Sequence, residues 1–248
     1  PAPITGFLAT ISKGAVFAAT LRLYVIGNFH SFPTVVTGLT ILSIISILVG
    51  NLLALRQDNI KRLLAYSSIA HFGYLLIALI AAGTLAPNGI SAIEPSAYYL
   101  AGYIFTTLIA TSLISALSSN YKKESASVGD IAGLFWKNPM LALCFSVSLL
   151  SLAGIPLTAG FIGKLYIFQM GVESHEWLLL SVLIIGSGIG IYYYLRLIYS
   201  MTISPSSSIN SNSSAPFYVT FSLTILTILV LFLGIYPQPL MEYLTWNT

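Results

Sequence analysis

Seven apolar segments divide the chain, and each is long enough to cross a lipid bilayer as a helix. A crossing helix needs about 20 apolar residues, because it rises 1.5 Å per residue through a hydrocarbon core about 30 Å thick. The segments cover approximately residues 4–27, 33–55, 60–83, 96–119, 139–171, 176–201 and 216–236. This division predicts an all-α integral membrane protein with about seven transmembrane helices.

The composition agrees with a membrane location. Of the 248 residues, 56% are hydrophobic and only 7% are charged, whereas soluble domains carry about 25% charged residues. The net charge is +3, but the ten basic residues are scattered and form no patch for nucleic acid. The single cysteine, Cys144, cannot form an intrachain disulfide and is expected to be a packing residue.

The fifth segment, 139–171, is too long for one crossing. Its 33 residues would reach about 50 Å as one helix, against a core of about 30 Å. Pro156 removes a backbone donor and disfavours a helical conformation at Ile155. We therefore predict two half-helices separated by a break at Gly154 and Pro156. Such breaks persist in membranes where the freed carbonyls line a cavity or find other partners.

Charged residues separate onto the two sides that alternate crossings would define. One side receives Arg56, Asp58, Lys61, Arg62, Lys122, Lys123, Glu124, Asp130, Lys137 and Arg196. The other receives Glu94, Glu173, Glu176 and Glu242, with Arg22 as its nearest base. By the positive-inside rule the basic side is cytoplasmic, which puts the N-terminus in the cytoplasm and the C-terminus outside.

Three further segments carry expectations about the membrane surface. Residues 128–137 mix apolar and charged side chains and predict a short interfacial helix with Phe135 and Trp136 among the headgroups. The Ser- and Asn-rich stretch 204–214 predicts a flexible loop. Tyr192, Tyr193 and Tyr194 are expected to anchor the sixth segment at the interface.

Two lysines lie inside apolar segments, far from any predicted loop. Lys164 follows the predicted break, and Lys13 lies about ten residues into the first segment. A lysine near a helix end can extend its ammonium to the interface, but these two lie too deep for that. A charge inside the membrane is expensive and by default marks an ion pathway. Desolvation disfavours the charged form of a buried lysine, so both can accept and donate protons.

The third segment adds exchangeable protons in the same part of the membrane. Tyr66, Ser67, Ser68 and His71 lie within six residues of one another. A lone histidine in a membrane helix is often only a packing residue, but hydroxyls beside it can support a chain of waters. We predict that these residues take part in the proton pathway with Lys13 and Lys164. The sequence holds no Cys or His cluster for iron–sulfur or haem binding and no Gly-rich nucleotide loop, so no metal or cofactor site is expected.

Three stretches resemble the antiporter-like subunits of respiratory complex I, NADH:quinone oxidoreductase. They are PAPITGFLATISK (1–13), QDNIKRLLAYSSIAH (57–71) and LAGIPLTAGFIGK (152–164). The pair Ser12-Lys13 and the stretch GIGIYYYLR (188–196) favour the member called N in bacteria and subunit 2 in mitochondria. The resemblance extends over essentially the whole chain.

That resemblance implies a fourteen-helix parent with two inverted five-helix repeats, of which this chain is the C-terminal half. The chain would then be one membrane domain, 1–248, with the second repeat over 33–201 and a last helix and tail over 216–248. Lys13 matches the central lysine of the family, Lys164 matches the lysine on the second broken helix, and His71 matches a polar position between them. The absence of an initiator Met before Pro1 fits a fragment or processed piece.

The function implied is a proton-translocating subunit that is coupled to quinone reduction elsewhere and carries out no redox chemistry itself. NADH, FMN, iron–sulfur clusters and quinone would belong to partner subunits. The expected partners are other membrane subunits, the N-terminal half and the lipid bilayer. The expected location is a bacterial inner (plasma) membrane, with the mitochondrial inner and thylakoid membranes as alternatives.

Two other functions stay open at this point. A subunit of a multisubunit cation/proton antiporter would transport sodium without NADH. A structural membrane anchor would tolerate replacement of either lysine by methionine, because a buried charge is costly.

Overall fold

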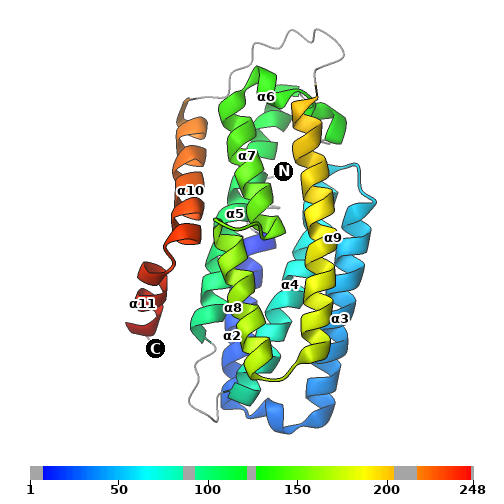
Figure 1. The fold of residues 1–248 in the computed structure, drawn as a ribbon, viewed down its shortest axis with the longest axis vertical. Coiled ribbons are helices and arrows are strands. Elements are labelled where there is room, and N and C mark those ends of the chain that lie inside the picture. The colour runs from blue at the N-terminus through cyan, green and yellow to red at the C-terminus, as the bar shows by residue number, and fades with distance from the viewer. Residues whose placement is uncertain (1–7, 86–92, 122–126, 204–216, 247–248) are drawn as a thin grey trace.

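The computed structural model describes residues 8–85, 93–121, 127–203 and 217–246 (Figure 1). These residues form a bundle of helices whose axes run roughly along its long dimension. Within the described part of the chain the only strand-like feature is a single bridge between Asn59 and Ser127. The predicted all-α membrane fold is therefore confirmed. The stretch 204–214, predicted to be a loop, lies outside the described residues, as do residues 4–7 of the first segment.

Among the described residues, five helices are long and apolar enough to cross a membrane. They are α3 (Pro33–Leu55), α4 (Ile60–Leu85), α5 (Ile93–Tyr121), α9 (Trp177–Thr202) and α10 (Phe217–Ile235). The shorter helices are α2 (Lys13–Ile26), α7 (Pro139–Ala153), α8 (Ala159–Glu173) and α11 (Gln238–Trp246), and a π-helical turn, η1 (Leu8–Ser12), leads into α2. The half-helices α7 and α8 replace the single fifth segment, as the proline predicted.

Local chemistry explains several helix ends. Pro33 and Pro139 stand in the first turns of α3 and α7, where the missing N–H would have no helical partner. The segment 128–137 was expected to form one short helix, and this is wrong. It forms a 3₁₀ turn, Val128–Ile131, and the four-residue α6, Leu134–Lys137. Gly133 separates the two with a φ of 73°, a conformation that costs glycine little.

The two aromatic residues of this segment behave differently. Trp136 is exposed, and its indole N–H donates to the carbonyl of Thr202 at 3.0 Å. Phe135 is half-buried and packs against the hydrophobic core. Only Trp136 is therefore available to the headgroup region.

The helix α4 lies at the centre of the bundle. In its most apolar window 78% of the residues are buried, against 28% in the corresponding windows of α3 and α10. Two hydrophobic clusters fill the interior, and α4 contributes to both. Apolar side chains on α3 and α10, such as Ile45 and Ile228, are exposed as expected for a lipid-facing surface. The polar residues in the middle of α4, Ser67, Ser68, His71 and Tyr74, thus lie in the protein interior rather than in lipid.

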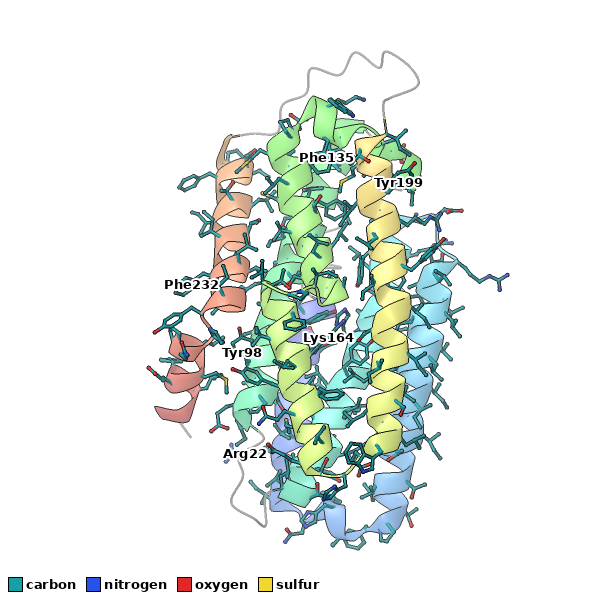
Figure 2. The ribbon with its side chains drawn as sticks, in the orientation of Figure 1. Arg22, Tyr98, Phe135, Lys164, Tyr199 and Phe232 are labelled. Atoms are coloured by element: carbon teal, nitrogen blue, oxygen red, sulfur yellow. The ribbon has the colours of Figure 1, made fainter. Side chains whose placement is uncertain are left out.

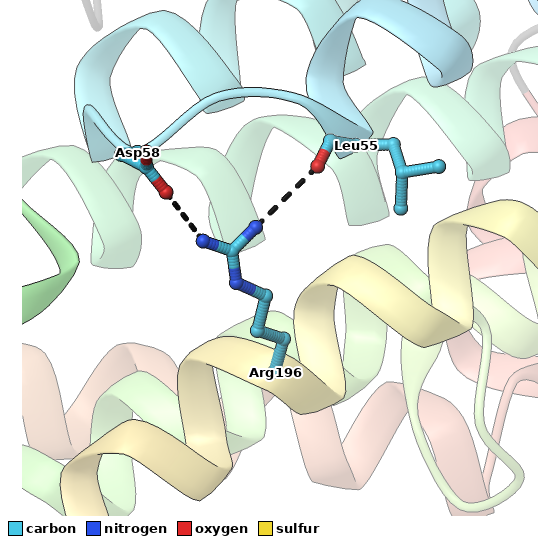
Figure 3. A network of polar contacts seen from close by, with 3 residues as sticks. All are labelled: Leu55, Asp58 and Arg196. Carbon is cyan, nitrogen blue, oxygen red and sulfur yellow. Dashed lines mark hydrogen bonds and ion pairs between the residues drawn. The ribbon is translucent and has the colours of Figure 1, made fainter.

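Polar contacts connect one end of α9 to the α3–α4 turn (Figure 3). The Arg196 guanidinium donates to the Asp58 carboxylate and, at 3.4 Å, to the carbonyl of Leu55. The backbone N–H of Val128 also donates to the Asp58 carbonyl at 2.9 Å. This is the end to which the sequence assigns most basic residues, and Arg22 lies near the opposite end (Figure 2). Their assignment to the cytoplasm and the outside stays a prediction.

Candidate functional site

The break between α7 and α8 is a defined helix terminus followed by a short turn. The N–H of Ile155 donates to the Leu150 carbonyl at 3.0 Å, and the N–H of Gly154 donates to that of Ser151 at 3.1 Å. These two bonds form a Schellman motif, which requires a left-handed residue at the helix end. Gly154 fills that position with a φ of 84°. The motif satisfies two carbonyls and leaves the last two of α7 available.

Lys164 binds those two carbonyls. Its Nζ lies 3.1 Å from the oxygen of Leu152 and 2.8 Å from that of Ala153, and the side chain is only 8% exposed. The ammonium thus caps the negative end of the α7 dipole from the first turns of α8. Figure 2 shows Lys164 in the interior, about halfway along the bundle. The buried position expected from the sequence is therefore present, and the carbonyl cage supplies the ligands that an ammonium needs there.

A second contact fixes the two half-helices against each other. The backbone N–H of Gly160 donates to Ser151 Oγ at 3.1 Å. A Cβ atom at Gly160 would lie 1.9 Å from the Ser151 carbonyl oxygen, so only glycine fits. Thr106 of α5 adds a hydroxyl contact to Ser151 Oγ at 3.2 Å. The distance between the Lys164 backbone and its carbonyl partners is therefore set by close packing.

Lys13 lies at the start of α2, directly after the π-helical turn. Its Nζ donates to Ser68 Oγ of α4 at 2.7 Å, and Ser68 in turn donates to the Ala65 carbonyl at 2.7 Å. Lys13 is half-buried and lines an open cavity of ≈ 290 Å³ together with Ser12, Val16, Ile69 and Phe72. The second lysine is thus more accessible than Lys164.

His71 lies between the two lysines. It is 5% exposed, and its Nδ1 lies 2.6 Å from the hydroxyl of Tyr99 on α5. On α4 it stands between Ser68, which binds Lys13, and Tyr74, whose ring lies beside Lys164. The ring of Tyr103 stacks at 5.0 Å and that of Tyr74 meets it edge-on at 5.7 Å. An imidazole held in this way can accept and return a proton.

Tyr74 completes the set on the side of Lys164. Lys164 Nζ lies 5.2 Å from the centre of the Tyr74 ring. Ser68, His71 and Tyr74 are spaced three residues apart and therefore share one face of α4. This face connects the surroundings of Lys13 with those of Lys164.

The structure does not bring Tyr66 or Ser67 into this arrangement. Tyr66 is half-buried and packs against the first hydrophobic cluster. Ser67 donates to the carbonyl of Leu64 in its own helix at 2.9 Å. Successive residues of a helix are rotated by about 100°. Tyr66 is two residues from Ser68 and therefore points away from the face that carries Ser68.

Three tyrosines of this site, Tyr74, Tyr99 and Tyr103, were not singled out from the sequence. A usable signal existed for Tyr74, which follows His71 by three residues.

The prediction that Tyr193 and Tyr194 anchor α9 at the membrane interface is wrong. Both are buried, and the Tyr193 hydroxyl donates to Asn51 at 3.0 Å. Only Tyr192 is exposed and free to act as an interfacial anchor.

No group of three or more His, Cys, Asp or Glu residues that could hold a metal ion occurs in the described part of the chain. The described acidic residues lie at helix ends or in connections, as Asp58 and Glu176 do, except Glu242 within the short α11. The chemistry that this site offers is the binding and exchange of protons by amines, imidazole and hydroxyls.

Comparisons with known proteins show which family the chain resembles. The chain is 48% identical over 98% of its length to NADH-quinone oxidoreductase subunit N of Methylococcus capsulatus, of which it covers 48%. Respiratory complex I from Thermus thermophilus contains a similar chain, with a TM-score of 0.82, 33% identity and coverage of 98% of this chain and 51% of that one.

A chain in the Mrp complex from Dietzia has the same fold, with a TM-score of 0.78, 17% identity and coverage of 92% and 49% of the two chains. The chain thus spans about half the length of the relatives that it matches. The family model described as NADH:quinone oxidoreductase/Mrp antiporter, TM, matches residues 1–190. This protein therefore belongs to the NADH:quinone oxidoreductase/Mrp antiporter transmembrane family.

Proposed function

We propose that the chain is the C-terminal half of a proton-translocating membrane subunit of an NADH:quinone oxidoreductase. The observation that supports this most strongly is the buried Lys164, which caps a broken helix and is joined along α4 to a second lysine. An ammonium in the membrane interior is costly and is retained where it carries ions or protons. The match to subunit N relatives favours the oxidoreductase among the complexes of this family.

In the proposed mechanism one proton moves laterally from Lys13 to Lys164. The Lys13 ammonium becomes a neutral amine, and the Lys164 amine becomes an ammonium, so that charge and protons balance. Ser68, His71 and ordered water would bridge the distance, because Ser68 already accepts from Lys13 and His71 contacts Tyr74, whose ring lies beside Lys164. Lys164 would then exchange its proton with one aqueous side beside the Gly154–Pro156 break. The carbonyls of Leu152 and Ala153 stabilise the charged form that this step produces.

The driving reaction would take place in other subunits. The chain would sit in a bacterial inner membrane beside other membrane subunits and the N-terminal half of its own subunit. NADH, FMN, iron–sulfur clusters and quinone would be held by those partners. Lys13 lines an open cavity, so a neighbouring segment could supply the acidic partner that no described residue provides in the interior.

The test uses the complete membrane complex with Lys13→Met or Lys164→Met, reconstituted in proteoliposomes. Proton uptake and NADH oxidation are measured in the same samples, and assembly is checked by the content of every subunit. Lys137→Met is the matched control, because Lys137 lies in α6 at the end of the bundle. We expect fewer protons per NADH for the two interior variants and parental values for the control. Parental values in all three would overturn the proposal and favour a structural anchor.

The alternative is a subunit of a cation/proton antiporter. It draws support from the family itself, which includes Mrp antiporters, and from the shared fold of the Mrp complex. This alternative predicts sodium-dependent proton flux in vesicles that receive no NADH. Flux that requires NADH and is insensitive to sodium would exclude it.

A further inference from the structure

A buried asparagine joins three helices next to the lysine site. Asn51 of α3 is 1% exposed and accepts from the Tyr193 hydroxyl of α9 at 3.0 Å. Its Nδ2 donates to the Ile47 carbonyl at 2.8 Å and to the Tyr74 hydroxyl of α4 at 3.2 Å. We call Asn51, Tyr74 and Tyr193 the Asn51 cluster. Each end of the Asn51 amide thus has a partner, and the two partners outside α3 come from different helices.

The packing of α9 is adapted to this cluster. A Cβ atom at Gly186 would lie 2.9 Å from the Tyr74 hydroxyl and 3.0 Å from Asn51 Nδ2. Gly186 thus lets the α9 backbone approach both polar groups closely. An amide without partners in an apolar interior is strongly destabilising, whereas a fully bonded set fixes its members in one arrangement. Apolar residues would fill the same space without any desolvation of polar groups, so packing alone does not explain the cluster.

The held end of Tyr74 determines where its ring lies. The hydroxyl is bound to Asn51, and the face of the ring lies 5.2 Å from Lys164 Nζ. The same ring meets His71 at 90° with 5.7 Å between centres. The tyrosine hydroxyl lies on the axis about which χ2 turns, so holding it fixes χ1 and the position of the ring. The ring is thereby positioned to attract the ammonium through its π-electrons.

We propose that Asn51 is a positioning residue that holds the Tyr74 ring between Lys164 and His71, so that the ammonium keeps its place beside the relay. The inference deepens the proposed function and rests on it. Asn51 touches neither lysine in this account and acts only through Tyr74. Tyr193 supports it by occupying the other end of the amide.

The first measurement reports the position of the ring and does not depend on pumping. Fluorotyrosine is placed at position 74 in the complete complex, and its ¹⁹F signal is recorded by magic-angle-spinning NMR in proteoliposomes. In the parent we expect a clear change of chemical shift on Lys164→Met, because the ammonium leaves the ring face. In the Asn51→Leu background that response should collapse. A response of parental size would overturn the positioning role.

The second measurement is the number of protons pumped per NADH oxidised. Loss of a desolvated cation–π contact is worth a factor of up to about 30. The number of protons pumped per NADH should therefore fall at least about twofold in Asn51→Leu, while NADH oxidation and assembly are preserved. Tyr193→Phe is a milder variant that keeps the bond between Asn51 and Tyr74, and it should fall less. Tyr98→Phe is the matched control. The buried Tyr98 hydroxyl donates to the Leu233 carbonyl at 2.6 Å, and neither residue belongs to the Asn51 cluster. This variant should pump normally.

A triple variant separates positioning from simple hydrogen-bond satisfaction. Asn51→Leu with Tyr74→Phe and Tyr193→Phe removes all three polar groups of the Asn51 cluster and should regain stability, since none of them is left unpaired. Under the proposal it still pumps as poorly as Asn51→Leu, because nothing tethers the ring. Recovery of pumping together with stability would overturn the proposal. If the NMR response collapses but Asn51→Leu and Lys164→Met both pump normally, the proposed function fails and the tether itself stands.

Discussion

Gly154→Ala is expected to destabilise the α7–α8 break in two ways, by straining the backbone and by displacing the Lys164 side chain. The residue has a φ of 84° and a ψ of 46°, and a side chain in the left-handed region costs about 1–2 kcal/mol. The new Cβ would lie 2.9 Å from Lys164 Cδ and 3.1 Å from its Nζ, so the lysine side chain must shift. Losing one hydrogen bond of a charged donor through that shift costs about 1.5–3 kcal/mol. We therefore expect a destabilisation of about 2.5–5 kcal/mol.

The assay compares matched glycine variants in the complete complex. Gly188→Ala is the control, because a Cβ there meets nothing within 4 Å and alanine in a helix is more stable than glycine by about 0.5–1 kcal/mol. Gly154→Asn separates the two causes, since asparagine tolerates the left-handed region but still places a Cβ against Lys164. We expect lower apparent melting temperature and fewer protons per NADH for Gly154→Ala, and a pumping defect with less instability for Gly154→Asn. If Gly154→Ala matches Gly188→Ala in both measurements, the carbonyl cage has no role.

Three further predictions concern the surroundings of the site. Ser68→Ala removes the acceptor of Lys13 and should lower proton pumping in proteoliposomes, whereas Ser67→Ala, which removes no partner of either lysine, should not. Burial raises the pKa of Glu176, so the folded state favours the protonated carboxyl. The folded state loses stability as pH rises through that pKa, because the buried carboxyl must then ionise. Glu176→Gln should therefore raise the melting temperature at pH 7, with the gain fading as pH falls towards about 4; an equal gain at both ends of a pH series would contradict this. Arg196→Leu breaks an ion pair whose side chains are 38% and 81% exposed and should cost at most about 1 kcal/mol in thermal melts; a loss of several kcal/mol would refute it.

Sequence alone predicts those features that depend on local chemistry. The break between α7 and α8 follows from the proline after Gly154-Ile155 and from the excess length of the segment. The burial of Lys164 follows from its depth in an apolar run. Its partners do not follow, because the carbonyls of Leu152 and Ala153 reach it only through the angle between the two half-helices.

The rotation of a helix about its axis is much harder to predict in a membrane protein. Tyr192, Tyr193 and Tyr194 lie about 100° apart around α9, so they cannot all face the headgroups. Only the first is exposed, and the other two pack inside. Tyr74 was missed for the same reason, because an apolar segment looks alike on its lipid side and its core side. The sequence shows Asn51 as a polar residue in an apolar segment, but it does not show that its partners lie on α4 and α9.

The central claim is that Lys164 carries protons, and the most direct test is its replacement by alanine in the complete complex. Proton uptake per NADH oxidised is measured in proteoliposomes beside the parent, with assembly verified in both. The account predicts that the ratio of protons to NADH falls while the complex remains assembled. An unchanged ratio at an unchanged rate of NADH oxidation would contradict it and would make the buried lysine a structural residue.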